Sequence, residues 1–80
     1  MPTLFTIFGF HFLFYSNDHE PIHVHVIKDG HEARYQVSPN VVLLENRGLK
    51  VSELRMAESV IEENKEVIVE RWNEYFKDVK

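Results

Sequence analysis

Four of the chain's five histidines lie within residues 18–37, and two of them, His23 and His25, alternate along one predicted strand. Side chains at positions i and i+2 of a strand point to the same face, with Cα atoms about 6.6 Å apart. Two imidazoles on one face can hold a metal ion, since zinc takes histidine nitrogens at about 2.0–2.1 Å. They can also carry protons near neutral pH. A strand has little structural reason for this pairing, so His23 and His25 are the first candidates for function.

A metal centre would need further ligands besides the two strand histidines. The candidate set for Zn²⁺ or another divalent metal is His23, His25, His19 and Asp18, with His11 and Glu32 as further donors. The expected hairpin register places Arg34, which is permanently charged, directly opposite His25. A positive charge beside a bound cation is unfavourable. The sequence therefore favours other functions over a native metal site.

The same face offers a second chemistry, the binding of an anion or a phosphate group. Arginine supplies a fixed charge and paired hydrogen bonds to oxyanions, and a histidine beside it can act as general acid or base. A small nuclease or phosphoryl-transfer enzyme would use such a pocket. The candidate ligand-binding residues are His23, His25, Arg34, His11 and Gln36.

The register of the histidine strand follows from a turn. Asp29-Gly30 separates two alternating segments and predicts a hairpin with a two-residue type I′ turn. The resulting pairs are Lys28–His31, Val26–Ala33, Val24–Tyr35 and Ile22–Val37 on one face, and Ile27–Glu32, His25–Arg34 and His23–Gln36 on the other. The first face is mostly apolar and the second is polar, an agreement that a slip of one residue would destroy.

The remaining pattern predicts one α+β domain over residues 1–80. An antiparallel meander of three to four strands is expected at about residues 4–15, 22–28, 31–37 and 41–45, with Phe8, Phe10, Phe12 and Phe14 facing the core. His11 then falls on the histidine face. Apolar spacing changes to a helical period at about 52–78, with Ser52 as the expected N-cap. Either one helix or two helices with a break near Asn64 would pack on one sheet face.

The length of the predicted helical segment favours two helices with a break near Asn64. A single helix over this range would be about 42 Å long at about 1.5 Å per residue, whereas four adjacent strands cover roughly 20 Å.

Composition indicates where the protein is located and which partners it does not bind. A net charge of −4 argues against direct, sequence-independent binding of nucleic acid, which depends on Lys and Arg. The absence of cysteine fits a reducing cytosol. The apolar stretch at the amino terminus lacks the basic segment of an export signal and is too short for a membrane helix. We expect a cytoplasmic location and no membrane contact.

A family resemblance rests on several short motifs. They are Met1-Pro2-Thr3-Leu4, the string Asp18-His19-Glu20-Pro21-Ile22-His23-Val24-His25 after Asn17, Glu32-Ala33 after a glycine turn, and a final helix with Glu70 and Trp72. Over nearly its whole length the chain resembles a family of small bacterial proteins of unknown function with a D-H-x-P-x-H-x-H motif. The resemblance implies a gene beside that of a second small protein, as in toxin–antitoxin modules. The chain differs from the usual pattern in having Asp-Gly at the hairpin and an additional His31.

Binding of a partner is the function that the sequence favours over catalysis. A small acidic domain with an apolar sheet and an amphipathic helix often completes its burial against another protein, and aromatic residues at a helix end are typical anchors. The interface candidates are Trp72, Tyr75 and Phe76. We expect a protein-binding module of a toxin–antitoxin-like pair, whose partner is a small protein or a second copy. The alternative is a small metal-binding or phosphate-handling enzyme that uses His23 and His25.

Overall fold

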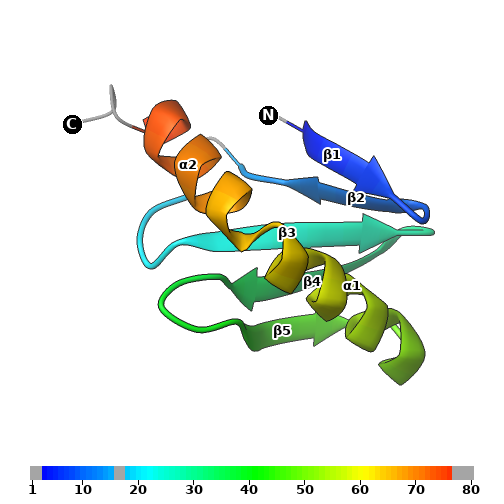
Figure 1. Cartoon of the computed structure of the whole chain (residues 1–80). Coiled ribbons are helices and arrows are strands. Elements are labelled where there is room, and N and C mark those ends of the chain that lie inside the picture. Colours follow the sequence, from blue (N-terminus) through cyan, green and yellow to red (C-terminus); the bar gives the residue numbers. More distant parts are fainter. Residues whose placement is uncertain (1–2, 16–17, 77–80) are drawn as a thin grey trace.

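A computed structural model describes residues 3–15 and 18–76 of the chain (Figure 1). The five strands form one antiparallel sheet in the order β1-β2-β3-β4-β5, and two helices follow. The elements are β1 (Thr3–Ile7), β2 (Phe10–Leu13), β3 (His23–Lys28), β4 (His31–Gln36), β5 (Val42–Arg47), α1 (Val51–Glu63) and α2 (Lys65–Phe76). The predicted α+β class and the meander are confirmed. The sheet has five strands, however, rather than three or four.

The hairpin of β3 and β4 has the predicted register throughout. His25 pairs with Arg34, His23 with Gln36 and Lys28 with His31. Asp29 and Gly30 adopt positive φ angles of 51° and 79°, as both central positions of a type I′ turn require. The histidine face and the core face are therefore assigned correctly by the sequence pattern.

The prediction of a single strand over residues 4–15 is wrong. The chain reverses at Phe8-Gly9, where φ is 55° and 81°, and the segment forms the hairpin β1–β2. This reversal takes Phe8 out of the core face and leaves its side chain 68% exposed. Positive φ is uncommon for a bulky residue, so the sequence carried no standard signal for a turn at this position. A twelve-residue strand is nonetheless longer than most strands in globular proteins.

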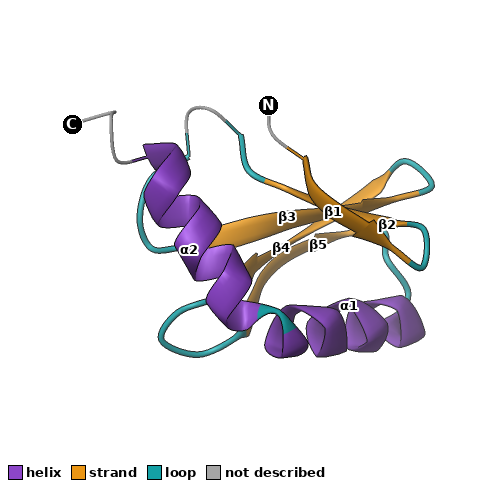
Figure 2. Cartoon of the chain, turned by 45° about the horizontal axis from the view of Figure 1, so that its top comes forward, coloured by secondary structure: helices purple, strands orange, loops and turns teal. Residues whose placement is uncertain are grey.

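Both helices cover the same face of the sheet (Figure 2). The core forms between this face and the helices, and its largest fully buried side chains are Tyr35, Phe10, Phe12, Phe14, Ile61, Ile68, Val24, Val26 and Val37. Trp72 is also buried in the core, and three aromatic rings lie within about 6 Å of it. They belong to Phe14, Phe76 and His23, at centroid distances of 5.1, 4.3 and 5.3 Å. The opposite face of the sheet, which carries His23 and His25, has no helix over it within the described residues.

The break near Asn64 is confirmed and has a local cause. The Asn64 side chain donates a hydrogen bond to the Val60 carbonyl at 2.8 Å, which ends α1, and the Asn64 carbonyl accepts the first bond of α2 from Ile68 at 2.9 Å. One residue thus caps two helices. The N-cap of the first helix is Lys50, two residues before the predicted Ser52, and the Glu53 carboxylate accepts the Lys50 N–H. The predicted end at residue 78 lies outside the described residues.

Tyr35 connects the sheet to α1 and gives the fold a pH-dependent contact. Its hydroxyl donates to the Leu54 carbonyl at 2.9 Å, and burial, with a smaller contribution from the charge of Glu58, raises its pKa from 10.0 to about 12.

We expect the folded state to lose stability at high pH, where Tyr35 loses its proton. The unfolded chain loses the Tyr35 proton near pH 10 and the folded chain near pH 12, so the Tyr35 contribution is complete below about pH 10 and is lost as pH rises toward 12. Relative to Tyr35→Phe, the wild-type free energy of unfolding should fall by more than about 1 kcal/mol between about pH 9 and pH 11. Urea unfolding of both proteins measures this difference, and parallel pH profiles would contradict the expectation.

Candidate metal centre

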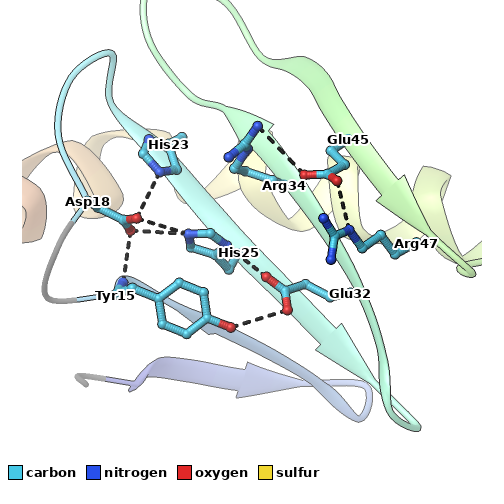
Figure 3. Close-up of polar contacts among 8 residues, drawn as sticks. All are labelled: Tyr15, Asp18, His23, His25, Glu32, Arg34, Glu45 and Arg47. Atoms are coloured by element: carbon cyan, nitrogen blue, oxygen red, sulfur yellow. Dashed lines mark hydrogen bonds and ion pairs between the residues drawn. The ribbon is translucent and has the colours of Figure 1, made fainter.

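Asp18, His23 and His25 bring their side chains together on the sheet face that lacks helices (Figure 3). His23 Nε2 lies 3.2 Å from Asp18 Oδ1, and His25 Nε2 lies 3.2 Å from Asp18 Oδ2. One ligand atom from each of the three residues lies within 4.8 Å of the others. Two strand residues and one loop residue thus converge on a single point.

Hydrogen bonds hold the remote nitrogen of each imidazole. His23 Nδ1 lies 2.8 Å from the Pro21 carbonyl oxygen, and His25 Nδ1 lies 2.9 Å from Glu32 Oε2. Both partners only accept hydrogen bonds, so each Nδ1 must carry the hydrogen and donate it. In a neutral imidazole the other nitrogen, Nε2, then has a free lone pair. The two free lone pairs point at Asp18.

A cation at its centre would stabilise this arrangement. With neutral rings, each Nε2 lone pair faces a carboxylate oxygen, and two acceptors at 3.2 Å repel each other. Protonation of one ring relieves only its own contact. Protonation of both places two positive charges on buried rings whose centroids are 5.3 Å apart. A metal ion among the three groups would relieve both contacts at once.

Asp18 is held in place by the backbone just before it. The Tyr15 N–H donates to Asp18 Oδ2 at 2.8 Å, and the Asp18 N–H donates to the Tyr15 carbonyl at 3.0 Å. Burial alone would raise the pKa of Asp18, but the hydrogen bond from the Tyr15 N–H and the neighbouring His25 and His23 imidazoles together outweigh burial, so the pKa lies below its usual value. The carboxylate is therefore ionised at neutral pH, which is the form that binds a metal. Ser16 and Asn17 lie outside the described residues.

The two histidines are buried by neighbouring aromatic side chains. His23 is 7% exposed and His25 is 6% exposed. The Tyr15 ring packs on His25 at a centroid distance of 4.1 Å, and the Trp72 ring approaches His23 at 5.3 Å. Electrostatic interactions are stronger in such a partly dry environment than at an open surface.

A second carboxylate, that of Glu32, binds the side of His25 that faces away from Asp18. Glu32 accepts the His25 Nδ1–H through one oxygen and the Tyr15 hydroxyl through the other, at 3.2 Å. Burial is the largest cause of the raised pKa of Tyr15, and the negative charge of Glu32 adds to it. The Tyr15 hydroxyl therefore keeps its proton and remains a donor to Glu32. A chain of contacts runs from Tyr15 through Glu32 to His25.

Arg34 lies opposite His25, as predicted, but its charge is directed to β5. Arg34 Nη2 lies 3.7 Å from Glu45 Oε1, and Figure 3 shows the guanidinium group turned toward Glu45. The expectation that Arg34 opposes a metal site took account of the backbone register alone. Glu45, which also binds Arg47, thus lies beside the Arg34 charge, a neighbour that the backbone register alone does not reveal.

The other candidates occupy different places. His11 lies on the histidine face but pairs with Ile27, is exposed, and contacts Thr6 Oγ1 at 3.2 Å. Gln36 is the strand neighbour of His23. His19 is exposed and lies outside the group of three ligand atoms. Among the interface candidates, Trp72 is only 3% exposed, Phe76 is partly buried and Tyr75 is 37% exposed, so Tyr75 has most of the free aromatic surface.

Sequence reasoning did not identify the functional roles of Tyr15, Glu45 and Arg47. Alternation after Phe14 would put Tyr15 on the histidine face, but the β2–β3 register, in which Leu13 pairs with His25, is what brings its ring onto His25. Glu32 was named only as a further donor. It is the diagonal neighbour of His25 in the predicted hairpin, which is close enough for long side chains to meet.

Residues 9–73 match the family described as "Domain of unknown function (DUF4160)". The chain belongs to this family. The DUF4160 match runs from the turn before β2 into α2 and contains Asp18, His23, His25, Glu32 and Arg34. Searches of curated proteins and of solved structures each found no match. Within the described part of this DUF4160 chain, neither helix has the length and apolar character needed to cross a membrane.

Proposed function

We propose that this DUF4160 chain binds one divalent transition metal ion of the zinc class through His23 Nε2, His25 Nε2 and the Asp18 carboxylate. The observation that carries the proposal is the convergence of two histidine Nε2 atoms on one carboxylate at 3.2 Å. The ligand types support it, because imidazole suits zinc, copper, iron and nickel, whereas magnesium and calcium prefer oxygen ligands.

The distances within the cluster suit such an ion. Ligands about 2.0–2.1 Å from a tetrahedral zinc ion lie about 3.3 Å from one another, and the two Asp18–histidine contacts are 3.2 Å. The hydrogen-bond acceptors of the two histidines are also those expected at a metal site. Metal-binding histidines usually donate their second N–H to a carboxylate or a backbone carbonyl, and Glu32 and Pro21 accept those bonds here.

Three protein ligands give the ion an open position. In catalytic zinc sites the fourth position holds water, and the ion lowers the pKa of that water to about 7. The site therefore supports a hydrolytic role better than a purely structural one, for which four protein ligands are usual. This is the enzymatic function that the sequence ranked second.

A titration of untagged, metal-free protein with Zn²⁺ tests the proposal. Competition with a chromophoric chelator should give one ion per chain, and Mg²⁺ at the same concentration should not compete. Absence of binding, or equal binding of Mg²⁺ and Zn²⁺, would refute a histidine-based centre. A histidine tag must be absent because it would bind the same metals.

A protein-binding role remains a second proposal, favoured by the edge of the sheet. Val42, Leu43 and Leu44 on the edge strand β5 are 45%, 40% and 42% exposed, and an exposed apolar edge can accept a strand from another protein. We propose that a small partner from a toxin–antitoxin-like pair in the cytoplasm adds its strand here. Co-expression with the product of the neighbouring gene should give a stable complex that Leu44→Lys disrupts. An intact complex with this variant would contradict the proposed surface.

A further inference from the structure

A cavity adjoins the proposed metal ligands. Its volume is about 350 Å³, and Asp18, His23 and Arg34 all contribute to its walls. Small-molecule sites occupy about 300–1,000 Å³ and combine apolar walls with a few polar groups. The cavity is therefore large enough for a small ligand that would touch the metal ligands and the Arg34 side chain together.

A bulge in β5 shapes the wall opposite the histidines. Arg34 pairs with Glu45, but the next residue of β4, Tyr35, pairs with Leu43. One additional residue, Leu44, therefore stands in β5 between the two pairs and contributes an apolar side chain to the cavity. Bulges of this kind often lie beside functional sites, where they redirect a side chain.

Arg34 has hydrogen-bonding capacity that its protein contacts leave unused. Its Nε is buried and makes no hydrogen bond to the described residues. Its contact with Glu45 is loose at 3.7 Å, whereas Arg47 Nε donates to the same carboxylate at 2.7 Å. Glu45 is thus bound mainly by Arg47. The Arg34 side chain as a whole is 42% exposed, so the rest of its guanidinium group can bind an oxyanion from the cavity.

The charges around the cavity select an anion once the metal is bound. The ion would contribute two positive charges and Arg34 one, against one negative charge from Asp18 and one from the exposed Glu20. Glu45, which also lies near Arg34, is offset by its ion pair with Arg47. The net charge of this group is then positive. A tetrahedral oxyanion could place one oxygen on the open metal position and two on the planar guanidinium group.

We propose that the metal ion and Arg34 together bind the phosphate group of a phosphate monoester in this cavity. This inference rests on the proposed metal centre and names the class of ligand that it takes. A monoester fits better than a diester, because only the monoester presents a dianion with three terminal oxygens to the two cationic groups.

The test uses Co²⁺ in place of Zn²⁺, since the visible spectrum of Co²⁺ reports its ligands. The Co²⁺-loaded protein is titrated separately with inorganic phosphate, phenyl phosphate and diphenyl phosphate. We expect phenyl phosphate to change the spectrum at least as strongly as inorganic phosphate, and diphenyl phosphate to act only at about tenfold higher concentration. Binding of inorganic phosphate without the monoester, or equal binding of monoester and diester, would overturn the choice of ligand.

Two arginine variants separate this inference from the metal proposal. Arg34→Met should keep the Co²⁺ spectrum and weaken phenyl phosphate binding at least tenfold. The control Arg55→Met removes the same charge from an exposed position on α1 and should change neither measurement. Unchanged phenyl phosphate binding in Arg34→Met would overturn the role of Arg34, whereas failure of the wild-type protein to bind Co²⁺ would refute the metal centre itself.

Discussion

His25→Ala should weaken Zn²⁺ binding by more than about 100-fold and should remove the protection that Zn²⁺ gives against thermal unfolding. Loss of a group that only supports a ligand typically costs about 10- to 100-fold in metal affinity, and His25 supplies one of three proposed ligand atoms directly. The loss of Zn²⁺ affinity in His25→Ala should therefore exceed that range. At a free Zn²⁺ concentration of 100 times Kd, binding stabilises the folded state by about 2.7 kcal/mol.

That stabilisation corresponds to a rise in Tm of about 10–20 °C for a domain of this size. Differential scanning fluorimetry with and without Zn²⁺ measures it for each variant. Glu32→Gln should keep part of the rise, because the amide oxygen can still accept the His25 Nδ1–H but carries no charge.

His11→Ala is the matched control. It removes an imidazole from the same sheet face, but His11 is exposed and pairs with Ile27, outside the ligand cluster. The wild-type rise in Tm should persist in this variant. An equal loss in His11→Ala and His25→Ala would show that Zn²⁺ binds to surface histidines in general and not to the proposed centre.

Trp72→Ala should produce the largest loss of stability among single substitutions in α2. Truncation of a buried tryptophan typically costs about 3–5 kcal/mol, and a domain of this size has only about 4–12 kcal/mol in total. The side chain is 3% exposed and contacts Phe14, Phe76 and His23. Urea unfolding should show a much lower midpoint, or a chain that is already unfolded.

Trp72→Phe keeps the prediction testable if the alanine variant does not fold. It should lose less stability and retain most Zn²⁺ affinity, because an aromatic ring still stands beside His23. Tyr75→Ala, at a position 37% exposed, should cost less than about 1 kcal/mol. A larger loss for Tyr75→Ala than for Trp72→Ala would contradict the placement of Trp72 in the core.

The β3–β4 hairpin could be predicted residue by residue because its turn is local. Asp29-Gly30 determines the turn type, the turn determines the register, and the register places His25 opposite Arg34. The first hairpin could not be predicted in the same way. Phe8 occupies a turn position that usually carries Asn, Asp or Gly, and the alternation of phenylalanines continues across the turn without a break.

The three proposed metal ligands are among the candidates named from the sequence, together with His19, but the contacts that hold them could not be predicted. Strand alternation places His23 and His25 on one face, and the adjoining loop offers Asp18. The distance from Asp18 to either ring depends on the path of that loop, which no local rule determines. The direction of the Arg34 side chain depends on Glu45, which lies on the next strand, β5. The position of that side chain does not follow from the β3–β4 hairpin. Backbone register alone therefore could not show that Glu45 lies beside the Arg34 charge.

X-ray absorption at the zinc edge of untagged, Zn²⁺-loaded protein is the most direct test of the central claim. The account predicts one tightly bound ion with two imidazole nitrogens at about 2.0–2.1 Å and oxygen in the remaining positions, and the loss of both imidazole signals in His23→Ala/His25→Ala. An ion surrounded by oxygen alone in the wild-type protein, or an unchanged spectrum in the double variant, would show that Asp18, His23 and His25 do not form a metal centre.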